Sequence, residues 1–274
     1  MVIPTYLYDH WIMEDVGPFD STTFVLGIGE KKGKAEVILR NEGVVCGLEE
    51  AKEIYLRAGA ERVELVAEEG DFAKGVVLIA YGKAEALHKA WRVAQNAVAI
   101  ASGVATYTRR MVEALKEANT NAKIVVARKA PPCRALYYKG VICGGAALHR
   151  STLSDTILVF KNHLVFIDLK EAIKKMEESP FTMGRKVVFE VDDIEDAIEV
   201  AKHGFDVQVD HVSPKELKEI IEKVKAINPN VKVYVGGGID ISNIKDYAIA
   251  DGIVTSAPYW AKPLDVTTRM TPLE

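Results

Sequence analysis

Cysteine is scarce in this chain, which has Cys46, Cys133 and Cys143 among its 274 residues. Three cysteines at these spacings are too few and too scattered for a disulfide framework or a zinc motif. We therefore expect three reduced thiols without a chemical role, as in a cytoplasmic protein.

Long apolar runs are also missing, and no stretch approaches the ~18 apolar residues of a membrane helix. The first residues, MVIPTYLYDHWIMED, lack the basic start and apolar core of a signal peptide, so the expected location is cytoplasmic. The net charge is −4, with acidic and basic residues interspersed. Nothing in this balance favours nucleic acid or a membrane surface as a partner.

Apolar residues make up 49% of the sequence, enough for one large domain or two smaller ones. Short strands and helices alternate over the first ~106 residues. The predicted elements there are strands at 34–47 and 75–82 and helices at 48–59 and 84–118. The second helix is apolar on more than one face around residues 94–104, which is typical of burial in a core or at a subunit contact.

A more regular alternation begins near residue 120. The predicted strands are 123–128, 156–160, 186–191, 207–212, 231–238 and 252–257, and predicted helices follow at 193–204, 213–227 and 240–250. Apolar strands that alternate with helices indicate βαβ units and a parallel sheet. A flat doubly wound sheet and a barrel are both compatible with this pattern. The barrel is favoured because nearly every strand ends on a polar residue or a glycine, and active sites of barrels gather at those ends.

The strand ends carry the residues with chemical potential. They are Arg128, Lys129, Lys161, Glu190, Asp210, Gly236–Gly238, Thr255 and Ser256, and the anion-binding pair His149 and Arg150 follows a glycine-rich stretch. In one barrel these side chains would form a cationic wall, two carboxylates and a glycine turn of the kind that holds phosphate. Each signal alone is weak, since a basic strand end is more often solvated. Their recurrence at the same place in five or six units favours a site.

Several motifs resemble one known family over essentially the whole chain. They are MEDVGPFDSTT (13–23), ASGVATYTRRMVEA (101–114), ARKAPPCRALYYKGVICGGAALHRSTLSDTIL (127–158), FEVDDIEDA (189–197) and the GGGID…ADGIVTS…PLD pattern (236–265). In this order they resemble the quinolinate phosphoribosyltransferases, also called nicotinate-nucleotide pyrophosphorylases. The resemblance implies an α/β protein with a sandwich-like N-terminal domain (1–106) and an open, incomplete TIM-like parallel barrel (107–264). The tail (265–274) would return to the first domain.

The resemblance also implies an activity and partners. Members of the family are homodimeric pentosyltransferases of NAD biosynthesis that use phosphoribosyl pyrophosphate and magnesium. They transfer the phosphoribosyl group to the ring nitrogen of quinolinate, and loss of carbon dioxide then gives nicotinate mononucleotide.

Residue roles follow by position from this resemblance. The acid-binding residues would be Arg92, Arg128, His149 and Arg150, with Arg92 supplied by the partner subunit. Arginine suits this role because its planar guanidinium pairs with a carboxylate through two hydrogen bonds. Lys129 would contact substrate or pyrophosphate. Glu190 and Asp210 would bind the ribose hydroxyls and magnesium, near the positive charge that develops on the sugar. The 5′-phosphate cradle would be formed by Gly236, Gly237, Gly238, Thr255 and Ser256.

One strand departs from the family pattern and bears on the acceptor. The family strand ends LIKDNH, whereas this chain has Phe160 in place of the lysine and Lys161 one residue later. Because side chains alternate along a strand, Lys161 should take the opposite face unless a bulge intervenes. The stretch HRSTLSDTILVFKNH resembles more closely the ModD subgroup, associated with molybdate-transport genes. Phe160 and Lys161 are therefore the candidate residues for acceptor choice.

Four functions remain open from the sequence. The first is transfer to quinolinate, and the second is a ModD-type transfer to a different acceptor. A Schiff-base aldolase that uses Lys129 or Lys161 is a third, although it would need a desolvated lysine. A ligand sensor that keeps the phosphate site without turnover is the fourth.

Overall fold

The computed structural model describes residues 3–118 and 120–273. Packing divides the chain into two compact units. The first comprises residues 1–109, 130–145 and 258–274, and the second comprises residues 110–129 and 146–257. Residues 130–145, which the sequence placed with the barrel, thus pack in the first unit.

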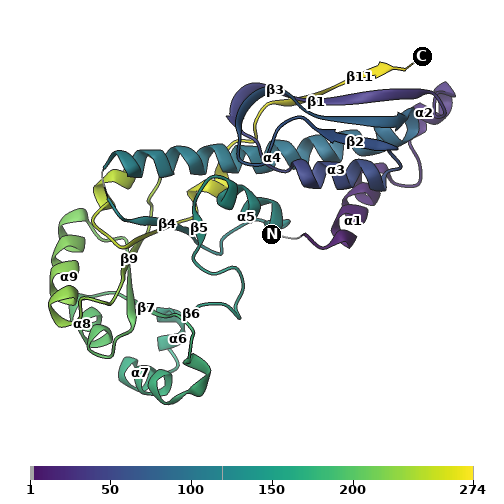
Figure 1. Cartoon of the computed structure of the whole chain (residues 1–274). Helices are drawn as coiled ribbons and strands as arrows, with labels where there is room; N and C mark the ends of the chain where they lie inside the picture. Colours follow the sequence, from purple (N-terminus) through teal and green to yellow (C-terminus); the bar gives the residue numbers. More distant parts are fainter. Residues whose placement is uncertain (1–2, 119, 274) are drawn as a thin grey trace. The chain divides into compact units, whose positions relative to one another are not determined.

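The first unit is built on a four-stranded antiparallel sheet with the order β11-β1-β3-β2. Its elements are α1 (Thr5–Val16), α2 (Ser21–Leu26), β1 (Lys32–Val44), α3 (Leu48–Arg57), β2 (Arg62–Leu65), β3 (Phe72–Lys83), most of α4 (Ala84–Glu117), α5 (Arg134–Cys143), η3 (Ala257–Trp260) and β11 (Val266–Pro272). The chain's last strand, β11, pairs with β1 (Figure 1). The sequence analysis found neither β2 nor α5, which are short and weakly patterned.

The apolar stretch of α4 is explained within this unit. Ala94, Val98 and Ala101 are fully buried there, and Gly103 lies against the backbone of the segment before β11. A Cβ at position 103 would come within 2.4 Å of the Lys262 carbonyl oxygen, so only glycine permits this approach. Burial within the chain itself therefore accounts for the apolar faces of this helix.

The second unit is built on a seven-stranded parallel sheet with the order β5-β4-β10-β9-β8-β7-β6. Its elements are β4 (Lys123–Val126), β5 (Ala147–Leu148), β6 (Ile157–Val159), α6 (Lys161–Leu164), α7 (Leu169–Glu178), η1 (Pro180–Thr182), β7 (Val187–Val191), α8 (Ile194–Lys202), β8 (Asp206–Asp210), α9 (Pro214–Ile227), β9 (Val233–Gly236), η2 (Ile244–Tyr247) and β10 (Gly252–Thr255). The edge strands β5 and β6 do not pair with each other among the described residues. The predicted open parallel barrel is confirmed.

The helices predicted at 193–204 and 213–227 form as α8 and α9. At the start of α9, Ser213 and Glu216 form a reciprocal capping box, with Pro214 at the first helical position. The predicted helix at 240–250 is wrong, because only the short helix η2 forms there. The Asp240 carboxylate accepts from both the backbone and the hydroxyl of Ser242, so local side-chain bonds replace the first helical turn.

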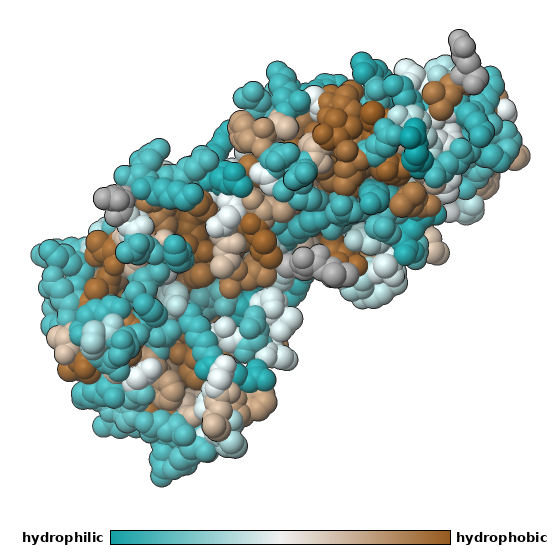
Figure 2. Space-filling model, viewed as in Figure 1, coloured by the Kyte–Doolittle hydropathy of each residue, from teal (hydrophilic) through white to brown (hydrophobic). Residues whose placement is uncertain are grey.

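Apolar side chains form the buried cores of the units. On the face that Figure 2 shows, hydrophilic residues alternate with apolar patches. Among the described residues, none of the helices combines the length and apolar character needed to cross a membrane.

Candidate active site

A cavity of about 510 Å³ opens at the carboxyl ends of the parallel strands in the second unit. We call it the strand-end cavity, and it is lined by Ala127, Arg128, Lys129, His149, Arg150, Leu158, Phe160, Glu190, Gln208, Asp210, His211, Gly236–Gly238, Ile239, Asp240, Val254, Thr255, Ser256 and Ala257. It brings together every site residue that the sequence singled out, except Arg92 and Lys161. The C-terminal strand ends of an α/β barrel are where such sites are built.

The alternation of side chains along each strand decides which residues reach the cavity. Leu158 and Phe160 share one face of β6 and its end, and Gln208 and Asp210 share one face of β8. Lys161 begins α6 and does not line the cavity. Its ammonium instead pairs with Asp192, 3.2 Å away, and both side chains are exposed. The alternation expected from the sequence therefore holds at this strand end.

The basic side of the cavity holds two buried nitrogen atoms without a hydrogen-bond partner among the described residues, Arg128 Nε and His149 Nε2. His149 is 6% exposed, and burial together with the charges of Lys186 and Arg150 lowers its pKa to about 4. Its ring is therefore neutral near pH 7. A buried unpaired polar atom is costly, so these two nitrogens are suited to a ligand. Arg128 Nε donates to an acceptor on that ligand, and His149 Nε2 does so in the tautomer that carries the proton on Nε2.

Two further cations complete this side. Arg150 has its guanidinium carbon 5.2 Å from the centre of the Phe160 ring, and the Phe160 ring stacks on His163 at 6.0 Å. Burial and the neighbouring charge of Arg128 lower the pKa of Arg150, which reflects two cations held close together. Lys129 is exposed at the rim. An anionic ligand would relieve the repulsion between these groups.

The acidic side is formed by β7 and β8. Glu190 lies opposite Gln208 in the strand register, and Gln208 Nε2 donates to Glu190 Oε2 at 2.7 Å. Burial and the nearby charge of Asp210 raise the pKa of Glu190. Gln208 Oε1 is buried without a partner among the described residues, so it offers a free acceptor inside the cavity.

The glycine turn lies beside these carboxylates. Gly237 has a φ of +88°, and a Cβ there would lie 2.5 Å from the His211 backbone nitrogen. A Cβ at Gly236 would lie 2.8 Å from Asp210 Oδ1, which explains why a side chain is absent here. The Thr255 hydroxyl donates to the Ile239 carbonyl oxygen at 2.6 Å and accepts from the Ala257 amide. Thr255 thus holds the shape of the loop, and both Thr255 and Ser256 line the cavity.

Glu190 and Asp210 are the residues that could hold a metal ion here. Carboxylate oxygens are the ligands that magnesium prefers, and Glu190 and Asp210 line the same cavity from the paired strands β7 and β8. One oxygen of each already has a partner, since Gln208 donates to Glu190 Oε2 and His211 Nδ1 lies 2.9 Å from Asp210 Oδ2. The other oxygens remain for a cation, so the donor set fits magnesium.

Arg92 lies elsewhere, in the first unit on α4. Its guanidinium carbon is 4.7 Å from the Trp91 ring centre, and its side chain lines a second cavity of about 540 Å³ together with Asp20 and His88. The Asp20 carboxylate caps α2 and also accepts from the Thr23 hydroxyl, which lies 2.8 Å from His88 Nδ1.

The sequence analysis missed Gln208 and His211. Gln208 could have been found, since it stands between the apolar residues Val207 and Val209 and two residues before Asp210, which places both polar side chains on one face of the strand. His211 has a φ of +57° and packs on Gly237, and no local sequence signal announces that conformation.

A parallel α/β barrel with cations, acids and a glycine turn at its strand ends is suited to an enzyme that binds anionic, phosphorylated substrates. Comparison with known families makes the class specific. The family model "Quinolinate phosphoribosyl transferase, C-terminal domain" matches residues 104–269, and the corresponding N-terminal model matches residues 20–102. This chain belongs to the quinolinate phosphoribosyl transferase family, and it is a phosphoribosyltransferase, a pentosyltransferase, by that membership.

Two kinds of named relatives are similar to the chain. "Putative pyrophosphorylase ModD" of Escherichia coli O6:H1 is 32% identical over 274 residues, which cover 96% of this chain and 95% of the relative. "Probable nicotinate-nucleotide pyrophosphorylase (carboxylating)" of Methanothermobacter thermautotrophicus is 29% identical, with 96% and 97% covered. The crystal structure of NadC from Streptococcus pyogenes has the same fold, with a TM-score of 0.89, 24% identity and full coverage of both chains.

Proposed function

We propose that this enzyme transfers the phosphoribosyl group of phosphoribosyl pyrophosphate to the ring nitrogen of a heteroaromatic acid. Quinolinate is the leading candidate for this acceptor. The observation that carries the proposal is the pair of unpartnered buried nitrogens, Arg128 Nε and His149 Nε2, in the same cavity as two carboxylates and a glycine turn. An aromatic acid offers oxygen acceptors to these nitrogens, and its ring fits against Phe160.

The proposed roles follow from the positions of the side chains. Arg128, His149 and Arg150 bind the carboxylates of the acceptor. Gly236 to Gly238, with Ser256, hold the 5′-phosphate through backbone and hydroxyl donors. Thr255 supports this cradle from behind. Lys129, at the exposed rim, contacts the departing pyrophosphate.

Glu190 and Asp210 are proposed to act on the ribose. Their negative charge stabilises the positive charge that develops on the sugar as the bond to pyrophosphate breaks, and they bind the ribose hydroxyls. With magnesium bound at these acids, the ion would neutralise charge on the leaving pyrophosphate. Arg92 is proposed to reach the acceptor from a partner subunit in a homodimer, as the family resemblance implies.

A second candidate is a ModD-type transfer to a different acceptor. It is favoured by Phe160, which occupies the place of the family lysine, and by Lys161, which pairs with Asp192 outside the cavity lining. The basic side of the strand-end cavity then has one cation fewer than the family pattern provides. This suits an acceptor with fewer carboxylates. A Schiff-base aldolase fits less well, because its lysine needs desolvation and both Lys129 and Lys161 are exposed.

Product analysis separates these candidates. The enzyme is incubated with phosphoribosyl pyrophosphate, magnesium and either quinolinate or a panel of other heteroaromatic acids, and pyrophosphate and nucleotides are quantified. The proposal predicts nicotinate mononucleotide, carbon dioxide and pyrophosphate in equal amounts from quinolinate. Turnover only with another acid would favour the second candidate. Binding of phosphoribosyl pyrophosphate without turnover of any acceptor would instead indicate a ligand sensor.

A further inference from the structure

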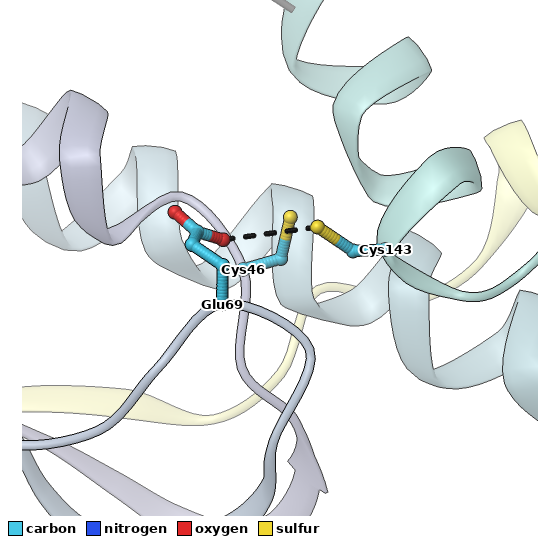
Figure 3. Close-up of side chains that lie close together, drawn as sticks. All are labelled: Cys46, Glu69 and Cys143. Carbon is cyan, nitrogen blue, oxygen red and sulfur yellow. Dashed lines mark hydrogen bonds between the residues drawn. The ribbon is translucent and has the colours of Figure 1, made fainter.

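Two of the three cysteines meet in the first unit, and neither of them lines the strand-end cavity. Cys46 follows β1, Cys143 is the last residue of α5, and Glu69 lies in the loop between β2 and β3. The two sulfur atoms and one Glu69 oxygen all lie within 4.8 Å of one another, and Figure 3 shows the carboxylate directed at the sulfurs. Two cysteines that are scattered in the sequence thus lie side by side in the fold, next to a carboxylate.

We propose that Cys46, Cys143 and Glu69 bind a thiophilic divalent metal ion, for which zinc is the best match. The spacing agrees with tetrahedral coordination. With Zn–S near 2.3 Å and Zn–O near 2.1 Å, tetrahedral geometry separates a sulfur and an oxygen by roughly 3.6 Å. The observed distance from Cys143 Sγ to Glu69 Oε2 is 3.8 Å. Water would take the fourth position.

The carboxylate is already oriented for this role. Glu69 Oε1 accepts from Lys139 Nζ at 2.8 Å and from the Glu49 amide, while Glu69 Oε2 accepts from the Gly47 amide at 3.1 Å. These donors fix the plane of the carboxylate and leave Oε2 directed at the sulfurs. Outer contacts of this kind orient the ligands of metal sites.

The backbone of Cys46 is equally fixed. Its amide donates to Ser102 Oγ, and the Ser102 hydroxyl donates to the Cys46 carbonyl oxygen, both at 2.9 Å.

Cys46 is fully buried, whereas Cys143 and Glu69 are half-buried, so an ion can enter from their side. A hydrogen bond between the two thiols lowers the pKa of Cys143 and raises that of Cys46.

The charges nearby select a divalent ion. Lys139 also pairs with Glu50, so the cluster holds two carboxylates, one ammonium and two neutral thiols. One divalent ion that binds both sulfurs displaces two thiol protons, and the net charge of the buried cluster stays the same. A monovalent ion that binds both thiolates would add a negative charge, which a buried site disfavours. Among divalent ions, thiolate ligands favour zinc over magnesium or calcium.

Cobalt substitution tests the proposal directly. The metal-free, fully reduced chain is titrated with Co²⁺ without oxygen, and thiolate-to-cobalt charge transfer is followed before Zn²⁺ is added as competitor. We expect one ion per chain, a charge-transfer band with the intensity of two thiolates, and its loss as Zn²⁺ displaces cobalt. X-ray absorption of the zinc-loaded wild-type chain should show two sulfur neighbours, a result that depends on no variant.

Matched variants locate the site. Cys143→Ser should lose about half of the band and most of the affinity. Lys139→Gln removes the ammonium that supports Glu69 and also pairs with Glu50, and it should weaken binding about 10–100-fold. Cys133→Ser changes an exposed thiol outside the cluster and should bind like the wild type. The proposal would be overturned by a wild-type chain that binds no stoichiometric Co²⁺ or Zn²⁺. Loss of binding in Cys133→Ser, or a metal-free Cys46–Cys143 disulfide as the only species isolated without reductant, would overturn it equally.

Discussion

Lys161 Nζ lies 3.2 Å from Asp192 Oδ1, and this ion pair holds the lysine outside the lining of the strand-end cavity. The two side chains are 64% and 69% exposed, so the pair is solvated. Phe160, the residue before it, faces the cavity instead. This strand end therefore presents an aromatic ring to the cavity, and the cation that follows it stays outside the lining.

Lys161→Ala is expected to leave catalysis nearly unchanged, with kcat/KM within about fivefold of the wild type. The reason is that an exposed ion pair contributes only about 0–1 kcal/mol. Arg128→Ala serves as the comparison, and we expect it to lower kcat/KM by more than about 30-fold because its guanidinium is placed to pair with a carboxylate. Steady-state kinetics of both variants check this. An equal loss in Lys161→Ala would mean that the lysine turns into the cavity when substrate binds.

Phe160→Lys should shift acceptor preference towards a diacid. A new charged hydrogen bond is worth about 1.5–3 kcal/mol, so the ratio of kcat/KM for quinolinate over nicotinate should rise about 10–150-fold. Phe160→Leu, which removes the ring without adding charge, is the matched control and should leave this ratio close to the wild-type value. If Phe160→Lys has an unaltered melting temperature and an unchanged ratio, residue 160 does not determine which acceptor the enzyme uses.

Gln208→Leu should move the acid limb of the pH–rate profile. The hydrogen bond from Gln208 lowers the pKa of Glu190, against the raising effects of burial and Asp210. Without that bond the pKa of Glu190 rises further. Because ionised Glu190 is the proposed active form, kcat/KM should then begin to fall at a higher pH than in the wild type. A lower rate with an unshifted limb would contradict the role of Glu190 as the titrating group.

His149 should make the fold less stable in acid. Its pKa is about 4 in the folded chain against 6.5 for an unperturbed histidine, so between these values the unfolded chain binds a proton that the folded chain does not. The contribution is complete above pH 6.5 and is lost as the pH falls towards 4, by up to about 3 kcal/mol.

Urea unfolding between pH 4.5 and 7.5 measures this effect. His149→Gln should show a weaker pH dependence than the wild type. His10→Gln, at an exposed position on α1, should match the wild type in this respect. Identical pH dependence in all three proteins would show that His149 is not the titrating group.

The barrel and its mouth could be predicted from the sequence because both depend on local patterns. Apolar strands alternate with helices, and polar residues at strand ends converge in any parallel barrel. The same alternation correctly separated Phe160 from Lys161. The same rule would also have predicted Gln208, because it lies two residues before Asp210 and therefore on the same face of β8.

Other features depend on contacts that no local pattern carries. The helix predicted at 240–250 gave way to the side-chain bonds of Asp240, which compete with the helical backbone. Cys46 and Cys143 are distant in sequence and meet only because α5 packs in the first unit. Their spacing alone could not have suggested a shared site.

The most direct test of the account is pyrophosphate release from phosphoribosyl pyrophosphate, with magnesium and quinolinate, by the wild type and two acid variants. Glu190→Gln removes a charge inside the strand-end cavity, and Asp192→Asn removes one two residues later outside its lining. The account predicts quinolinate-dependent release by the wild type and by Asp192→Asn, and a loss of more than about 100-fold in Glu190→Gln. It would be contradicted if Glu190→Gln kept near-wild-type activity, or if no heteroaromatic acid caused the wild type to release pyrophosphate.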